Sequence, residues 1–403
     1  MRIVKKFLDT AKPHFEQGGR LSILFYFWEA FDTFLMTPES VARGRVHVRD
    51  GLDLKRMMTF VMVALVPCII FGMYNVGYQA NYVLAGMGEN VINGWRGYLL
   101  SLAGVTADPN NILFCFLHGF MYWVPVYIVT MAVGVGIEVI FSTVRKEEVN
   151  EGFFVTGMLF PCILPPTIPL WQVAVAIAFG VVVGKEVFGG TGMNFLNPAL
   201  VARAFLFFAY PGGISGDMVW MAVDGHSGAT ALSQIVSGGP ESMVYGFWDS
   251  FWGFVPGSMG ETSAFCCLIG VVFLMVIGVA SWRIVISCVA STLVFGTLLY
   301  FIGSDTNSMF NLLPHWHLVL GGFAFGCAFM ATDPVTAANT LKGQYVYGAL
   351  IGAMVILVRV LNPAYPEGMM LAILFANVFA PLIDYFVIQA NIKRRQRRCQ
   401  MTA

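Results

Sequence analysis

The feature that most constrains this chain is a series of long apolar runs separated by short polar segments. A helix needs about 20 residues to cross a hydrocarbon core roughly 30 Å thick, and most of these runs approach or exceed that length. Only 11% of the residues are charged, compared with roughly 25% in soluble proteins, so lipid must surround much of the chain. We therefore predict an all-α membrane protein with about ten transmembrane helices. They cover 57–78, 113–143, 151–165, 169–187, 193–210, 263–281, 283–303, 313–331, 344–362 and 367–390.

Two of the segments, 151–165 and 313–331, contain proline or glycine interruptions and are predicted to be half-length or broken helices. Each is the third of five segments in its half of the chain. An odd number of spans in each half makes the second half insert upside down. The pattern is typical of two inverted five-helix repeats with a site near the membrane midplane, although two broken helices can also align by chance.

The positive charges alternate from loop to loop. Ten of the 23 Lys and Arg residues lie in the first 56 positions, five lie in the last eleven, and 211–262 contains none. Because cytoplasmic loops carry the excess of Lys and Arg, this pattern predicts that both termini lie in the cytoplasm and that 211–262 lies outside. The predicted regions are a cytoplasmic N-terminal region (1–56), a first five-helix repeat (57–210), a periplasmic loop (211–262), a second five-helix repeat (263–390) and a basic cytoplasmic tail (391–403). Within the first region, 21–36 is apolar but too short to span, and we expect it on the cytoplasmic face or against a partner.

The periplasmic loop contains the most specific motif, DGHSGAT, at 224–230. Small residues at Gly225, Gly228 and Ala229 leave the backbone accessible to a large planar group. The Thr230 hydroxyl can form a phosphoester, Ser227 is a second candidate hydroxyl, and Asp224 can orient the reacting group. From the residues alone, a plain turn of small residues remains the alternative.

DGHSGAT resembles the flavinylation motif of the family that contains the B subunit of sodium-translocating NADH:quinone reductases and the D subunit of Rnf complexes. The stretches EAFDTFLMTPESVARGRVHVRDGLDLKR, GKEVFGGTGMNFLNPALVARAFLFFAYP and FMATDPVTA resemble the same family, so the resemblance covers nearly the whole chain. It implies a place in the bacterial inner membrane, with FMN attached through its phosphate to Thr230 by a flavin transferase outside the membrane. It also implies non-covalent riboflavin, ubiquinone as electron acceptor, Na⁺ as the transported ion, and the A, C, D, E and F subunits as partners.

Polar residues inside the apolar runs are further candidates, because burying them in lipid is costly. Asn194 and Asn197 are expected on one face of the 193–210 helix, where the resemblance implies the riboflavin site. Capping of a helix that begins at Pro198 is the alternative for these two residues. Arg203 is expected to face a flavin, a quinone or a carboxylate.

Other polar and small residues are assigned to the ion and the quinone. Glu138, Asp333 and Asp384 are candidates for the ion pathway, although carboxylates suit proton relays as well as Na⁺, and Asp333 could simply cap a helix. Gly134 and Gly136 permit close approach of a flat ligand or a helix, and the resemblance implies that quinone binds near them.

The sequence also limits the chemistry expected of the chain. It has no dinucleotide-binding or P-loop pattern, so we expect NADH oxidation elsewhere in the complex and no catalytic residue here. The cysteines lack metal-site spacing, so no metal site is expected, although Cys115 and Cys327 could line a cofactor between subunits. We expect no nucleic-acid partner. The alternatives are an Rnf-type D subunit and a solute channel of the urea-transporter type, whose layout the five-plus-five arrangement resembles.

Overall fold

The computed structural model describes residues 54–88, 94–146, 152–223, 228–362 and 366–402, together with a few single residues before 54. These parts of the chain contain helices and no strand. The predicted N-terminal region, including 21–36, lies almost entirely outside the described residues.

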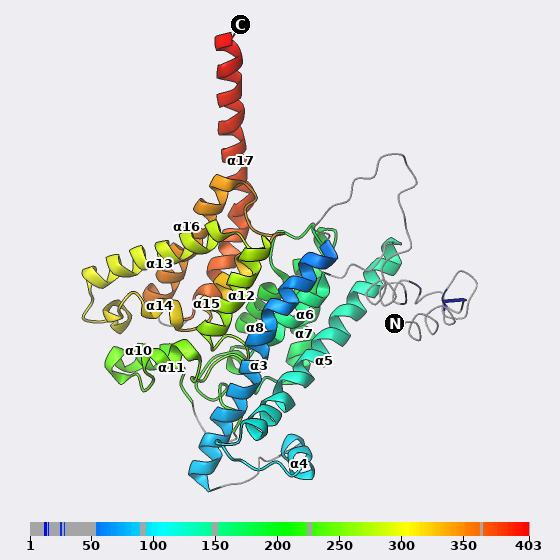
Figure 1. Ribbon diagram of the computed structural model, residues 1–403, viewed down its shortest axis with the longest axis vertical. Helices are drawn as coiled ribbons and strands as arrows, with labels where there is room; N and C mark the ends of the chain where they lie inside the picture. Colours follow the sequence, from blue (N-terminus) through cyan, green and yellow to red (C-terminus); the bar gives the residue numbers. More distant parts are fainter. Residues whose placement is uncertain are drawn as a thin grey trace.

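Six of the ten predicted segments are long helices, apolar enough to cross a membrane. They are α3 (Leu54–Met87), α5 (Ile112–Arg145), α7 (Leu170–Gly184, continued by η2, Glu186–Phe188), α13 (Trp282–Ile302), α16 (Leu341–Leu361) and α17 (Met369–Thr402). In Figure 1, α3 and α5 run side by side along the length of the molecule. The all-helical membrane architecture is therefore confirmed for these segments.

The other four segments are short or broken. They are α6 (Phe153–Cys162), α8 (Pro198–Ala209), α12 (Ala264–Ile277) and a broken stretch formed by α14 (Trp316–Val319), α15 (Phe323–Phe325) and the π-helical η5 (Gly326–Met330). The two segments predicted as half-length or broken are indeed so. The sequence did not predict that α8 and α12 would also be short. Asn197 and Pro198 start α8 late, and Gly278, in the left-handed conformation, ends α12 early.

The same helix pairs pack in each half of the chain. The second helix contacts the fourth, as α5 with α7 and α13 with α16, and the fourth contacts the fifth, as α7 with α8 and α16 with α17. The first helices of the two halves, α3 and α12, contact each other. This correspondence agrees with two repeats of five segments, while their inverted relation stays a prediction.

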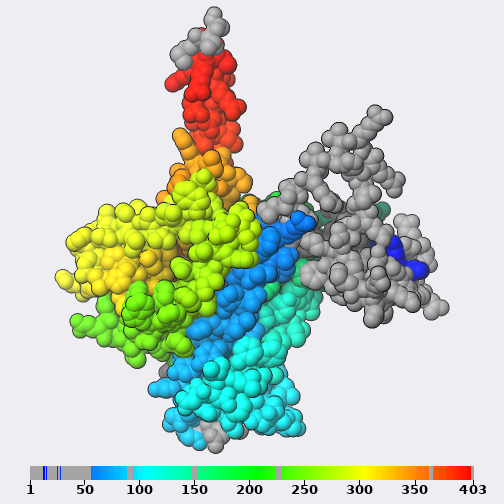
Figure 2. All heavy atoms as spheres, viewed as in Figure 1, coloured from blue at the N-terminus to red at the C-terminus, as the bar shows by residue number. Residues whose placement is uncertain are grey.

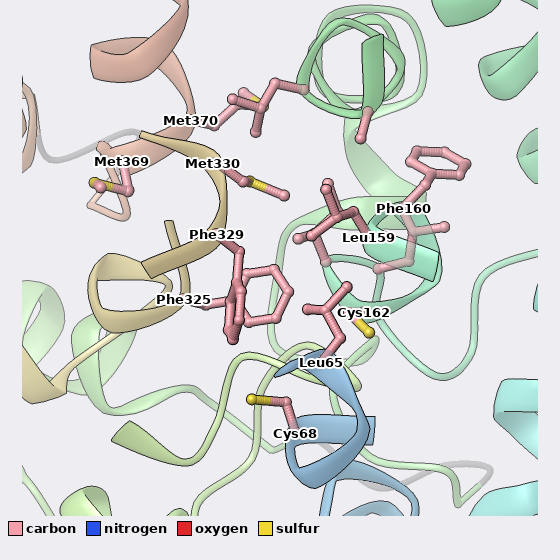
Figure 3. Packing of buried hydrophobic residues seen from close by; sticks show 14 of the residues in the cluster. Leu65, Cys68, Leu159, Phe160, Cys162, Phe325, Phe329, Met330, Met369 and Met370 are labelled. Carbon is pink, nitrogen blue, oxygen red and sulfur yellow. The ribbon is translucent and has the colours of Figure 1, made fainter. Parts of the chain in front are cut away.

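The core lies where the two halves meet (Figure 3). Leu65 and Cys68 of α3 and Leu159 of α6 lie on the side that faces Phe325 and Phe329 of the broken stretch. All five side chains are nearly inaccessible to solvent. The short helices α6 and η5 are therefore buried, as polar backbone at membrane depth must be.

Short helices also occupy the segments outside the spans. They are α4 (Trp95–Leu102), α9 (Pro211–Ile214), α10 (Ala231–Gly238), η3 (Pro240–Ser242), α11 (Phe247–Trp252) and η4 (Ser308–Asn311). In Figure 1, α10 and α11 lie toward the lower left, away from the basic ends of α3 and α5 at the upper right. Through most of the tail predicted at 391–403 the chain stays helical, because α17 continues as far as Thr402, and this end of the helix stands clear of the rest of the molecule (Figure 2).

Candidate functional site

A cavity of about 270 Å³ lies between α8, α10, the segment before α12 and the turn after α14. Its walls are mostly apolar, and its polar lining comes from α8, the start of α10 and the segments that precede α12 and α17. The apolar lining includes Phe207, Ile214, Trp220, Val236, Val319 and Met370. The polar lining consists chiefly of Arg203, Thr230, Ser233, Ser258, Glu261, Thr262 and Glu367.

Thr230 lies in the wall of this cavity as the N-cap of α10. Its Oγ1 accepts a hydrogen bond from the backbone N–H of Ser233 at 3.3 Å. Because Thr230 lies at the N-terminus of α10, the positive end of the helix dipole faces its oxygen. The first turn of α10 contains no acidic residue that would offset this positive end. Asp217 holds both sides of Thr230 in place. The Asp217 carbonyl accepts a hydrogen bond from Gly228 N–H at 2.7 Å, and the Asp217 carboxylate accepts one from Ser233 Oγ at 3.1 Å.

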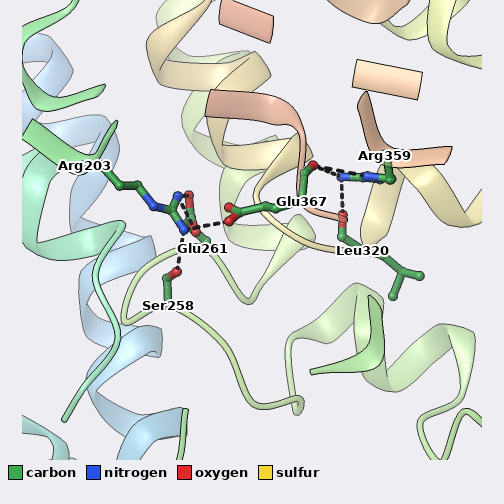
Figure 4. A network of polar contacts seen from close by, with 6 residues as sticks. All are labelled: Arg203, Ser258, Glu261, Leu320, Arg359 and Glu367. Atoms are coloured by element: carbon green, nitrogen blue, oxygen red, sulfur yellow. Dashed lines mark hydrogen bonds and ion pairs between the residues drawn. The ribbon is translucent and has the colours of Figure 1, made fainter. Parts of the chain in front are cut away.

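A buried ion-pair cluster forms the polar lining (Figure 4). Arg203, on α8, donates to both carboxylate oxygens of Glu261, at 3.1 and 3.3 Å. It also donates to Glu367 at 2.8 Å and to Ser258 Oγ at 3.5 Å. Burial raises the pKa of the Glu261 carboxyl, and the neighbouring Arg203 opposes that rise. The cluster joins a helix of the first half to the segments that precede α12 and α17.

Arg359 completes the charge balance of this region. Its guanidinium donates to the backbone carbonyls of His317 at 2.8 Å, Leu320 at 3.1 Å and Glu367 at 3.2 Å. Two arginines and two glutamates thus lie together, and the net charge of this group is zero when all four side chains are ionised. Buried charges are tolerated when they are paired and hydrogen-bonded in this way.

Glycine allows the backbone to approach these charges. A Cβ on Gly322 would lie 2.6 Å from Glu261 Oε1 and 3.0 Å from Glu367 Oε1. Gly321 adopts a left-handed backbone with φ +64°. Side chains at these two positions would therefore displace the carboxylates or strain the turn.

A second, smaller cavity of about 60 Å³ lies between α6, α8 and η5. It brings together Asn194, Asn197 and Asp333 with Lys185 and Thr191. The Thr191 hydroxyl oxygen is buried and has no hydrogen-bond partner among the described residues. The hydrogen-bond donors among these side chains suit the polar edge of a flavin. The volume of this cavity, however, is well below the roughly 300 Å³ of small-ligand pockets, so these residues do not enclose a ring.

The two asparagines do not share a helix face, contrary to the prediction. Asn197 caps α8, accepting from the backbone N–H groups of Ala199 at 3.0 Å and Leu200 at 3.4 Å. Asn194 lies before the helix and donates to the Leu196 carbonyl at 3.0 Å. The Asn-Pro pair ends the extended loop and starts α8, because proline is favoured at the first helical position.

The three predicted ion-pathway carboxylates have different surroundings. Glu138, on α5, forms a buried ion pair with Lys185, which follows α7. Asp333 accepts from Val335 N–H at 3.2 Å, from Thr336 Oγ1 at 3.0 Å and from Asn197 Nδ2 at 3.4 Å. Lys185 and Asp333 line the same cavity, and Glu138 is paired with Lys185. Glu138 and Asp333 therefore lie in one region of the molecule.

Asp384 lies elsewhere and holds the start of α16. Its carboxylate accepts from the backbone N–H groups of Asn339 at 2.7 Å and Thr340 at 3.0 Å, and from Thr340 Oγ1 at 2.5 Å. A carboxylate that receives three donors from one helix terminus has a clear structural role. Its predicted part in the ion pathway stays a prediction.

The predicted quinone glycines have unequal surroundings. A Cβ on Gly134 would lie 1.9 Å from the Phe153 ring, so this glycine serves the packing of α5 against α6. Gly136 is exposed and has nothing within 4 Å of its would-be Cβ.

Other predicted residues are only partly described. Asp224, Gly225 and Ser227 of the motif lie outside the described residues. The Ala229 carbonyl accepts from Gln234 Nε2 at 3.1 Å. Cys115 is buried and receives a hydrogen bond from Asn81 Nδ2 at 3.4 Å, and Cys327 is buried in η5.

Sequence reasoning missed Glu261, Thr262 and Glu367 as cavity residues. All three lie in loops that immediately precede helices, where a carboxylate or hydroxyl looks like an ordinary cap or surface group. The signal that could have revealed them is the SMGET stretch, in which Glu261 enters an apolar segment without a basic neighbour in sequence.

Comparison with known proteins shows the family of the chain. A family model described as NQR2, RnfD, RnfE family matches residues 41–393. The chain is 56% identical to the B subunit of the Na(+)-translocating NADH-quinone reductase of Azotobacter vinelandii, over 98% of this chain and 99% of the relative. It is 53% identical to the protein of that name in Chromohalobacter salexigens, over 98% and 96% respectively. With a family match over most of its length and these full-length relatives, the chain belongs to the NQR2, RnfD and RnfE family.

Proposed function

We propose that this chain is the B subunit of a sodium-translocating NADH-quinone reductase in the bacterial inner membrane. It would act there as a redox component together with the A, C, D, E and F subunits. The relatives that carry this name align with 98% of the chain, so the alignments include most of the N-terminal stretch. That extent favours this assignment over an Rnf-type D subunit, because the resemblance implies that such a subunit is similar in its membrane part and begins near the first span.

The observation that carries the proposal is the place of Thr230 in the wall of the 270 Å³ cavity. A phosphoester on Thr230 Oγ1 would keep the oxygen that caps α10 and put the phosphate at the N-terminus of that helix. Helix N-termini bind phosphate through their free N–H groups and the helix dipole. This matters because 211–262 contains no Lys or Arg to hold the anion.

The cavity also suits the ring system of FMN. It has apolar walls, including Trp220 and Phe207, and a polar lining that contains Arg203 and Glu261. Its volume of about 270 Å³ lies just below the range for small-ligand pockets, roughly 300–1,000 Å³. Bound FMN would supply reversible electron transfer, while Thr230 tethers it and the apolar walls exclude water.

Riboflavin is proposed near Asn194 and Asn197, with ubiquinone as the final acceptor near Gly134 and Gly136. The smaller cavity offers polar contacts for one edge of a ring and does not enclose it, so we derive no step through this second flavin. Glu138 and Asp333, near that cavity, are proposed to line part of the Na⁺ pathway. Glu138 is buried and Asp333 is partly buried, and both carboxylates supply the oxygen ligands that hard cations prefer.

Flavin fluorescence in a denaturing gel tests the proposal. The full chain is coexpressed with a flavin transferase as wild type and as Thr230→Val, with Ser227→Ala as the control within the same motif. We expect fluorescent bands for the wild type and Ser227→Ala and a dark band for Thr230→Val. A dark wild-type band, with the transferase active on another substrate, would favour the solute-channel alternative.

A further inference from the structure

Helix α4 carries large apolar side chains on the face that it turns away from the rest of the molecule. These residues, called the α4 stripe, are Trp95, Tyr98, Leu99 and Leu102, each between 42% and 67% exposed. Their spacing places them on one side of the helix. Gly97 and Leu100, on the opposite side, are buried. In water, this arrangement would leave four large apolar side chains hydrated, which is unfavourable.

The polar side chains of α4 bond to the protein itself. Arg96 Nε donates to the Met121 carbonyl at 3.2 Å, and the guanidinium lies over the Tyr122 ring, 4.3 Å from its centroid. Ser101 Oγ donates to the Tyr98 carbonyl at 2.8 Å. No other charged or amide side chain lies on α4. The helix thus lacks the polar face that a helix presents to water, and such helices are buried in protein or in lipid.

The contact with Met121 places α4 at the boundary of the membrane. α5 has 34 residues, which is about 51 Å at 1.5 Å per residue, whereas the hydrocarbon core is roughly 30 Å thick. An upright α5 centred in the core therefore projects about 10 Å at each end. Met121 lies nine residues after Ile112, or about 14 Å along the helix, so it is level with the edge of the core. Tilting α5 would bring Met121 deeper into the lipid.

Other features of this end of the molecule also indicate lipid. In Figure 1, α4 lies beside the end of α5 that is far from the C-terminus, on the predicted periplasmic side. α5 exposes Ile112 and Leu113 at this end, so lipid extends past the level of Met121. With eight residues, α4 is about 12 Å long and too short to cross the core.

We propose that α4 is an interfacial helix and that the α4 stripe lies in the outer leaflet of the bilayer, where acyl chains meet headgroups. The composition of the stripe fits this place, because Trp and Tyr are enriched where a membrane meets water. The two leucines beside them enter the hydrocarbon. This inference is independent of the flavin proposed at Thr230.

The test places the full chain in phospholipid vesicles whose acyl chains carry bromine, which quenches indole fluorescence on contact. One set of vesicles carries bromine near the headgroup end of the acyl chains, and a second set carries it near the methyl end. Because the chain has nine tryptophans, the contribution of Trp95 is taken as the difference between the wild type and Trp95→Phe. Trp171→Phe is the matched control, because Trp171 is 55% exposed, compared with 51% for Trp95, and lies at the start of the candidate span α7.

We expect the Trp95 contribution to lose most of its intensity with bromine near the headgroup end, and less with bromine near the methyl end. The Trp171 contribution should also be quenched, since lipid surrounds a span. Trp95 emission that bromine leaves unchanged, in vesicles where it quenches Trp171, would overturn the inference. The measurement is then repeated on the assembled complex. Quenching of Trp95 there supports lipid as the cover, whereas quenching that is lost on assembly would assign the α4 stripe to a partner subunit and overturn the inference.

Discussion

The close approach of α3 to the loop that carries Glu261 and Thr262 gives a sharp prediction for Gly72→Ala. A Cβ at Gly72 would lie 1.7 Å from the Met259 carbonyl oxygen, 2.8 Å from its carbon and 3.3 Å from the Gly260 Cα. All three obstacles are backbone atoms, which cannot rotate away as a side chain would. The helix and the loop must therefore move apart.

Overpacking of this kind costs about 1–3 kcal/mol, and a backbone obstacle places Gly72→Ala at the upper end, near 3 kcal/mol. Gly86→Ala is the matched control on the same helix, since nothing lies within 4 Å of its would-be Cβ. There alanine should be neutral or slightly stabilising, by at most about 1 kcal/mol, through helix propensity.

The assay is thermal unfolding of the detergent-purified chain, followed by tryptophan fluorescence. We expect Gly72→Ala to lower the melting temperature by about 5 °C and Gly86→Ala to leave it nearly unchanged. Because Gly72 supports the cavity loop, Gly72→Ala should also change the absorbance spectrum of the covalent flavin. Equal melting temperatures for the two variants would refute the close approach of α3 to Met259.

Two further predictions concern residues outside the Thr230 cavity. Asp384→Asn removes the charge that three donors share at the start of α16, and should lower the free energy of unfolding by about 1–3 kcal/mol, measured by thermal unfolding. A normal melting temperature combined with lost sodium transport in the assembled complex would instead favour the ion-pathway role. Asn194→Ala should reduce the riboflavin that copurifies with the complex, measured by chromatography of the released flavins, while covalent fluorescence at Thr230 stays unchanged. Undiminished riboflavin would exclude this cavity as its site.

Much of the fold could be predicted because lipid imposes a simple length requirement. The long helices such as α5 and α13 are single apolar runs, and their existence follows from the need to satisfy every backbone group within the bilayer. The ends of the helices were harder to predict, because they depend on single residues. Asn197, for example, caps α8, so Asn194 lies before the helix. The continuation of α17 through the basic tail could not be read from the apolar run, because the run marks only the part of a helix that lipid surrounds.

The candidate site was only partly predictable for a different reason. The motif identified Thr230 because covalent attachment needs a particular local sequence. The other side of the cavity is assembled from Arg203, Glu261 and Glu367, which are far apart in the chain. No local pattern links them, because helix α8 and two loops meet only after the two halves pack together.

The most direct test of covalent flavin attachment is the mass of the proteolytic peptide that contains Thr230. The peptide is taken from the chain purified out of a complex that also contains its partner subunits. We expect the added mass of FMN, less one water, to be located by fragmentation on Thr230. An unmodified peptide from an active complex, or modification located on Ser227, would contradict attachment at Thr230.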